Sequence, residues 1–199
     1  SPTHPLSELK TDIMKHGILS LVCVAALLSV AFTACNGKKE APQTADDASE
    51  SAAPDSTVYG VCGEATSMHS LQLITDVGDT LSYMVYDDGE TPSDVQGGLM
   101  AGDHVAVVGA MTDGELVAKK VINVTTLLGR WTSIDKDFEI EEGGTVKSAV
   151  KAESTPWTYW KIFNGRLVLN KDTFDVAGLG ADSLYLENNR GIFVYKRNL

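Results

Sequence analysis

Short runs of β-branched, leucine and aromatic residues, separated by turn signals, follow one another from residue 57 to the end of the chain. In one of these runs Leu81, Tyr83 and Val85 would share one face of a strand, and the residues between them would share the other. Gly-Asp, Asp-Gly and Asn-Gly pairs stand between the runs, and tight turns favour these dipeptides. Strands of this kind must pair to bury their apolar face, so the sequence predicts an all-β fold.

The runs divide into two groups that predict two successive barrels. Residues 57–126 hold five runs, with a short helix predicted over residues 93–101 between the third and the fourth. Residues 127–199 hold seven or eight shorter runs joined by hairpin signals, as in an up-and-down antiparallel barrel. The strongest signal is Asn164-Gly165, because both residues tolerate the positive φ of a type I′ turn. The groups meet without a linker, so the barrels are expected to touch while each keeps its own hydrophobic pattern.

Two passages carry a resemblance to known families. The stretch GLMAGDHVAVVG, residues 98–109, is similar to the passage from helix to fourth strand in small bacterial OB-fold proteins. Gly129-Arg130-Trp131 resembles the G-x-W of the first lipocalin strand, and the stretches FEIEEGGTVKS, YWKIFNGRLVL and DSLYL resemble lipocalin-like domains of bacterial lipoproteins. These resemblances imply an OB-like first barrel and a short lipocalin-like second barrel. They also imply that Trp131 plugs the closed end of the second barrel under a late arginine, either Arg190 or Arg197.

Residues 14–34 have the features of a secretion signal. A basic start is followed by an apolar core of roughly 15 residues, which suits a signal peptide. A membrane-spanning helix needs about 20 apolar residues, so a permanent transmembrane segment is the weaker reading. Residues 32–35, Phe-Thr-Ala-Cys, resemble a bacterial lipobox, although leucine is usual at the place of Phe32. The resemblance implies cleavage before Cys35 and its modification by diacylglycerol and an acyl chain such as palmitate. Residues 1–13 are expected to be an upstream extension outside the fold.

Residues 35–56 are predicted to be a lipidated cysteine followed by a disordered tether. No Val, Ile, Leu, Met or aromatic residue occurs in residues 36–56, so the segment cannot bury enough apolar area to fold. A flexible coil of this length has a reach of roughly 25 Å. Asn36, rather than Asp, follows the cysteine, which resembles lipoproteins passed to the outer membrane. The sequence therefore predicts a cell-envelope lipoprotein whose membrane contact is the lipid on Cys35.

The charge balance excludes one class of partner. The chain carries 16 Lys and Arg against 27 Asp and Glu, which gives a net charge of −11. Residues 1–34, which are the upstream extension and the leader together, contain two acidic and two basic residues, so their removal leaves this net charge unchanged. A strongly acidic surface repels phosphate backbones, so we do not expect nucleic acid as a partner.

Cysteine and histidine give no sign of a metal or cofactor site. Cys23 would leave with the leader and Cys35 would carry lipid, so Cys62 is the only thiol left and no intramolecular disulfide is expected. Cys62 stands in a strand-like run, where a small buried apolar residue is the ordinary interpretation. His69 and His104 are far apart in sequence, and no third ligand has suitable spacing. No cofactor and no metal are predicted.

No catalytic residues emerge from the sequence, and we expect the protein not to be an enzyme. Asp135, Asp137, Glu139 and Glu141 alternate with other residues as on a solvated strand face, and no nucleophile stands with a base. The sequence therefore favours a non-catalytic binding or interaction module. Its partner would be an envelope protein or, as the alternative, a small apolar ligand carried in the second barrel.

Large aromatic residues concentrate in the second barrel and are the candidates for a ligand site or a packed core. A short eight-stranded barrel is just wide enough for its own side chains or for one small ligand, so pocket and core compete for the interior. So many rings on such short strands favour the packed core. The candidates are Trp131, Trp157, Tyr159, Trp160, Phe163, Tyr185, Phe193 and Tyr195, and Phe174 belongs to the same region.

Overall fold

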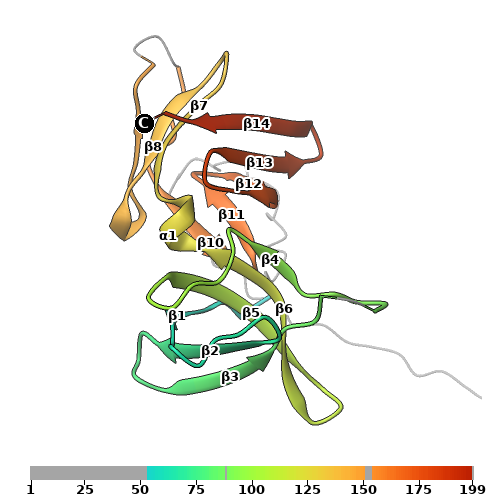
Figure 1. Cartoon of the computed structure of the whole chain (residues 1–199). Coiled ribbons are helices and arrows are strands. Elements are labelled where there is room, and N and C mark those ends of the chain that lie inside the picture. Colours follow the sequence, from blue (N-terminus) through green and yellow to red (C-terminus); the bar gives the residue numbers. More distant parts are fainter. Residues whose placement is uncertain (1–52, 88, 151–153, 199) are drawn as a thin grey trace, which may run out of the picture. The chain divides into compact units, whose positions relative to one another are not determined.

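A computed structural model describes residues 53–87, 89–150 and 154–198, and it has the predicted all-β architecture (Figure 1). These residues belong to one compact unit that contains both barrels. The predicted extension, the signal peptide, Cys35 and most of the tether lie outside the described residues. Within the described part, no helix has the length and apolar character that crossing a bilayer requires.

The first barrel consists of five strands that close on themselves. In sheet order β3, β2, β1, β5 and β6 are neighbours, and a parallel contact between Met84 of β3 and Val117 of β6 closes the ring. All other neighbours around the ring are antiparallel, which is the order of an OB-like barrel, as predicted. The strands are β1 (Val58–Cys62), β2 (Ser70–Thr75), β3 (Thr80–Met84), β5 (His104–Thr112) and β6 (Glu115–Asn123).

The short helix predicted over residues 93–101 is wrong. This segment instead contains β4 (Asp94–Gln96), which pairs in parallel with β6. Ser93 Oγ accepts from the amide of Tyr86 and donates to the carbonyl of Ala118, at 3.0 and 2.6 Å. These tertiary hydrogen bonds override the weak helical preference of so short a segment. Two glycines with positive φ, 87° and 77°, follow β4 and prevent a helix from continuing there.

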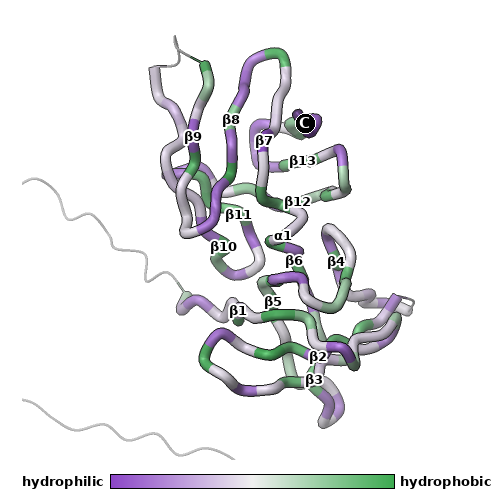
Figure 2. The backbone as a smooth tube through the Cα atoms, turned by 60° about the vertical axis from the view of Figure 1, so that its left-hand side comes forward, coloured by the Kyte–Doolittle hydropathy of each residue, from purple (hydrophilic) through white to green (hydrophobic). Residues whose placement is uncertain are grey.

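The predicted alternation in the first barrel is confirmed. Tyr83 and Val85 are buried, and Leu81 packs against the same hydrophobic cluster. Figure 2 shows that hydrophobic and hydrophilic residues are interspersed along the strands of both barrels. Cys62 belongs to this cluster and is 2% exposed, in agreement with its interpretation as a small core residue.

The second barrel consists of eight antiparallel strands and is nearly closed, as predicted. Strand β14 pairs with β7, which joins the last strand to the first. Between β9 and β10 the ring is completed by a bridge from Thr145 to Tyr159 and by a 3.0 Å hydrogen bond from the amide of Val146 to the carbonyl of Thr158. The strands are β7 (Gly129–Thr132), β8 (Asp137–Ile140), β9 (Val146–Ser148), β10 (Trp160–Phe163), β11 (Arg166–Leu169), β12 (Asp172–Leu179), β13 (Ser183–Asn188) and β14 (Gly191–Arg197).

The predicted Asn164-Gly165 hairpin joins β10 to β11, with φ of 49° and 72° at its two central residues. Both values are positive, as a type I′ turn demands.

Helix α1 (Val124–Leu127) leads from β6 into the second barrel. The amide of Thr126 donates to the side-chain oxygen of the N-cap residue of this helix, Asn123, at 2.9 Å. A short 3-10 turn, η1 (Glu142–Gly144), lies between β8 and β9.

The core of the second barrel extends into the first. Ala106 and Ile122 of the first barrel are buried in the same hydrophobic cluster as the inward side chains of β7 to β14. In addition, the hydroxyl of Tyr59 donates to the carbonyl of Ile162 and accepts from its amide, both at 3.0 Å. Each barrel thus has its own alternating pattern, but these residues bury part of the first barrel against the second.

Candidate functional site

One end of the second barrel is closed by the predicted tryptophan plug. Trp131 is 0% exposed, and its Nε1 donates to the carbonyl of Leu127 in α1 at 2.8 Å. The guanidinium carbon of Arg197 lies 4.1 Å from the centroid of a Trp131 ring, and Arg197 Nη1 donates to the carbonyl of Leu128 at 2.8 Å. Gly129 has φ of 118°, and a Cβ there would lie 2.5 Å from Arg197 Nη1. A larger residue at this position would be strained by this φ and would displace the guanidinium of Arg197.

Of the two arginines that the resemblance left open, Arg197 covers Trp131, while Arg190 lies elsewhere. Nη2 of Arg190 is 3.0 Å from Oδ1 of Asp172, at the start of β12. The second oxygen of this carboxylate, Oδ2, accepts from Nε1 of Trp157 at 3.2 Å. Asp172 therefore fixes both an arginine and a tryptophan at the end of the barrel away from α1.

Five aromatic rings in edge-to-face contact fill the interior near that end. Phe138 packs against Trp157 and Tyr195 with centroid distances of 5.0 and 5.1 Å. Phe174 packs against Trp157 and Phe193 at 5.9 and 5.8 Å. Each edge-to-face contact contributes about 0.5–1.5 kcal/mol beyond the burial of area. We call these five residues the aromatic floor, because a cavity lies directly above them.

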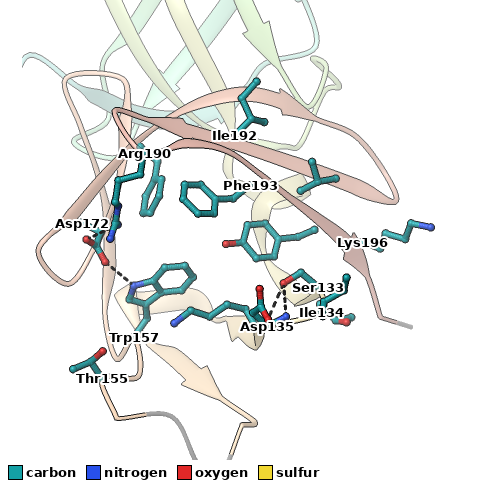
Figure 3. A pocket seen from close by; sticks show the side chains of 15 residues that line it. Ser133, Ile134, Asp135, Thr155, Trp157, Asp172, Arg190, Ile192, Phe193 and Lys196 are labelled. Carbon is teal, nitrogen blue, oxygen red and sulfur yellow. Dashed lines mark hydrogen bonds and ion pairs between the residues drawn. The ribbon is translucent and has the colours of Figure 1, made fainter.

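This mouth cavity has a volume of about 800 Å³ (Figure 3). Four of the five floor residues line it, all except Phe138, together with the β7–β8 hairpin and the chain of β14. Small-molecule sites typically have volumes of about 300–1,000 Å³, apolar walls and a few convergent polar groups. The mouth cavity matches this description in its volume and its aromatic floor, but eight of its fifteen lining residues are polar or charged. Its polar lining consists of Thr132, Ser133, Asp135, Lys136, Thr155, Asp172, Arg190 and Lys196.

Burial changes the acid–base behaviour of two side chains at the mouth. Lys136 Nζ lies 4.3 Å from the centroid of a Trp157 ring, and burial lowers the pKa of this lysine, with the charge of Asp172 acting in the opposite direction. Burial raises the pKa of the Tyr195 phenol to about 12. The phenol therefore stays neutral at physiological pH and contributes an aromatic wall to the cavity.

The structure brings only part of the predicted aromatic set to this cavity. Trp157, Phe193 and Tyr195 line it. Trp160, by contrast, is 8% exposed in the hydrophobic core, and its Nε1 donates to the carbonyl of Glu141 at 2.7 Å. The remaining predicted aromatics are not part of the site.

Tyr159 and Tyr185 are 47% and 41% exposed, so they face outward. Phe163 is half-buried, and Lys161 Nζ lies 4.8 Å from the centroid of its ring. The interior is thus packed, as the sequence favoured, and a cavity lies above the packed rings.

A second cavity, of about 480 Å³, includes Tyr59, His104 and Trp160 in its lining. The rings of Tyr59 and His104 are stacked with centroids 6.0 Å apart, and His104 Nε2 lies 3.0 Å from Oδ1 of Asp76.

The two histidines that the sequence considers as metal ligands have different carboxylate partners. His104 lies beside Asp76, whereas His69 Nδ1 lies 3.7 Å from a carboxylate oxygen of Asp87. Among the described residues, no group of three or more His, Cys, Asp or Glu side chains has the arrangement to hold a metal ion.

The acidic stretch of the second barrel forms surface ion pairs. Arg130 donates to both carboxylate oxygens of Asp137, at 2.8 and 2.6 Å, and this hydrogen bonding lowers the pKa of Asp137. Glu141 pairs with Lys147 at 2.5 Å.

Burial, together with the charge of Asp103, raises the pKa of the Cys62 thiol to about 11. Cys62 is therefore a protonated core residue at neutral pH.

Sequence reasoning missed the polar part of the mouth. The alternation of acidic residues from Asp135 onward predicts a solvated strand face that includes Lys136, and the resemblance gives Arg190 a role only as a cover for Trp131. In an up-and-down barrel, alternate hairpins lie at the same end. The turns near residues 134, 171 and 190 follow the first, fifth and seventh strands of this barrel, so all three lie at the same end. Counting the strands in the sequence would therefore have placed their charged residues together.

Searches against models of protein families, curated proteins and solved structures find no match for this chain.

Proposed function

We propose that this protein is a lipid-anchored, non-catalytic binding module of the bacterial cell envelope, and that it holds a small apolar ligand in the mouth cavity. The observation that carries the proposal is the mouth cavity, which has the volume of a small-molecule site and an aromatic floor. An aromatic floor favours ligands that gain from leaving water. We therefore choose the ligand carrier, which the sequence left as the alternative.

The anchor in this proposal rests on the lipobox-like residues 32–35 and on the polar composition of residues 36–56. A lipid on Cys35 and a tether with a reach of roughly 25 Å would hold the barrels close to a membrane. By its resemblance to sorted lipoproteins, this membrane is the outer membrane. A module in that position meets apolar molecules that leave or enter the bilayer.

A second candidate function is contact with an envelope protein. Ile192 and Val194 of β14 are 61% and 47% exposed, and the exposed Tyr185 lies directly opposite Val194 on β13. Exposed apolar side chains that adjoin one another are typical of surfaces that bind a partner. Ile192 and Val194 also line the mouth cavity, so this face adjoins the ligand site, and a substitution of Tyr185, which does not line the cavity, tests the second function separately.

A titration with the apolar fluorescent probe 1-N-phenylnaphthylamine tests the ligand-binding function. We expect saturable binding of one probe per chain. Thr155 lines the cavity, is exposed and makes no side-chain hydrogen bond described within residues 53–87, 89–150 and 154–198. In Thr155→Trp a large ring should occupy the mouth and weaken binding at least about tenfold, which corresponds to about 1.4 kcal/mol.

The matched control is Thr80→Trp, which adds the same ring at an exposed position on β3 of the first barrel. It should leave probe binding unchanged, and both variants should melt close to the wild type. Equal binding by Thr155→Trp and the wild type, or no saturable binding at all, would refute the proposed function.

A further inference from the structure

We propose that the second cavity is a binding site for a neutral aromatic molecule whose ring carries an N–H or O–H donor. This site is separate from the mouth cavity and goes beyond the proposed function. Its lining comes from β1 and β5 of the first barrel, from α1, and from η1 and β10 of the second barrel. Small-molecule sites often lie at junctions of this kind, and about 480 Å³ is a typical volume for them.

Two aromatic side chains line this cavity with their polar atoms bonded inside the protein. The hydroxyl of Tyr59 donates to the carbonyl of Ile162 and accepts from its amide, both at 3.0 Å. Nε1 of Trp160 donates to the carbonyl of Glu141 at 2.7 Å. A ligand therefore meets ring surface at both residues and no unused polar group. Ring surface of this kind favours another aromatic ring, which can pack against it face-on or edge-on.

The imidazole of His104 and two aliphatic side chains extend this apolar surface. The rings of His104 and Tyr59 are inclined by only 19°, with centroids 6.0 Å apart. Nε2 of His104 lies 3.0 Å from Oδ1 of Asp76, which holds the imidazole in place. Val124 and Leu128 of the α1 segment also line the cavity. A flat apolar molecule can therefore leave water against rings and aliphatic groups together.

The loop on the second-barrel side of the cavity is fixed next to Trp160. Thr145 forms a bridge with Tyr159, and the carbonyl of Glu141 accepts from Trp160 Nε1. A Cβ at Gly144 would lie 3.2 Å from the carbonyl oxygen of Trp160, so the loop and β10 approach each other closely. Because the contacts of both walls already exist within the protein, a ligand has little ordering to impose on them.

Glu142 of this loop gives the cavity a hydrogen-bond acceptor. Glu142 is exposed, and no side-chain hydrogen bond or ion pair involves it in the described part of the chain. Carboxylate oxygens accept hydrogen bonds, so this side chain selects ligands that donate one. Lys161 also lines the cavity, but its Nζ lies 4.8 Å from the ring centroid of Phe163, which is not a lining residue. Charges of both signs at the cavity oppose a charged ligand and favour a neutral one.

Isothermal titration with indole and 1-methylindole tests the inference. Both molecules have the same fused ring, but in 1-methylindole a methyl group replaces the hydrogen of the N–H donor. The mouth cavity also has aromatic walls, so the titrations use Thr155→Trp, in which the mouth is filled. We expect one indole per chain and an affinity at least about fivefold higher than that of 1-methylindole, because hydrogen bonds to a carboxylate are stronger than those between neutral groups.

Three further substitutions in Thr155→Trp locate the donor preference. Glu142→Leu removes the acceptor at an exposed position and should make the two affinities equal. Glu142→Gln keeps an oxygen acceptor and should retain part of the preference. Glu64→Leu is the matched control, because Glu64 is exposed in the first barrel outside this cavity, and it should leave the preference unchanged.

Equal affinities of Thr155→Trp for indole and 1-methylindole would overturn the inference. So would a preference that Glu142→Leu leaves unchanged, or the absence of saturable indole binding. Binding of 1-methylindole by the Glu142→Leu protein at least as tightly as by Thr155→Trp shows that the site is folded, so that the lost preference reports the acceptor. None of these results bears on the mouth cavity, which the titration with 1-N-phenylnaphthylamine tests by itself.

Discussion

Replacing Trp131 with alanine should lower the free energy of unfolding by about 3–5 kcal/mol, as is usual when a fully buried aromatic side chain is truncated. Trp131 is 0% exposed, and the substitution also removes the donor to the carbonyl of Leu127 and the ring on which Arg197 lies. A domain has only about 5–15 kcal/mol of stability, so the loss is a large fraction of the total. Urea denaturation followed by circular dichroism measures the change directly.

Tyr185→Ala is the matched control for this prediction. It also removes an aromatic ring from the second barrel, but Tyr185 is 41% exposed on the outer face of β13. Its loss should cost about 1 kcal/mol or less, because exposed side chains contribute little to stability. If Trp131→Ala proves as mild as Tyr185→Ala, Trp131 is not the plug of the barrel.

Cys35→Ala should move the protein from the membrane fraction to the soluble fraction, or leave the leader uncleaved. Each buried CH₂ of a lipid contributes about 0.8 kcal/mol, and two or more acyl chains anchor a protein stably. Without the thiol there is no atom to receive them, so the expected effect is close to complete. Cell fractionation and labelling with an alkyne analogue of palmitate measure membrane association and acylation separately.

Cys62→Ala provides the control for lipidation. Cys62 is buried, and its thiol has a pKa of about 11, so it is a poor acceptor for a lipid and should not affect labelling. Membrane association that is retained in Cys35→Ala would refute the anchor. Loss of labelling in Cys62→Ala would show that the lipid is attached elsewhere.

The architecture could be predicted because local signals and the barrel topology agree. Leu81, Tyr83 and Val85 occupy alternate positions of one run, and the structure packs all three toward one core. The positive φ values of Asn164 and Gly165 likewise follow from residue type alone. The helix predicted for the segment of β4 is wrong because the pairing of β4 with β6 depends on residues about 25 positions away, which local propensity does not take into account.

The candidate site could be predicted only in part, because the direction in which a ring points depends on register. Trp157 and Trp160 are separated by two residues, so a regular strand would place them on opposite faces. Both are nevertheless buried, since β10 begins only at Trp160 and Trp157 precedes it outside the regular strand. A bulge between Val176 and Gly178 shifts the pairing of β12 with β13 in the same way. Irregularities of this kind have no signature in a single sequence.

A native mass spectrum of the protein purified from membranes tests most directly whether the mouth cavity holds a ligand. Spectra recorded under native and denaturing conditions distinguish a bound molecule, which denaturation releases, from the covalent lipid, which it does not. We predict one small molecule per native chain of the wild type and of Thr80→Trp, and none on Thr155→Trp. Native and denatured masses that agree for the wild type, or a bound molecule that persists on Thr155→Trp, would contradict ligand binding in the mouth cavity.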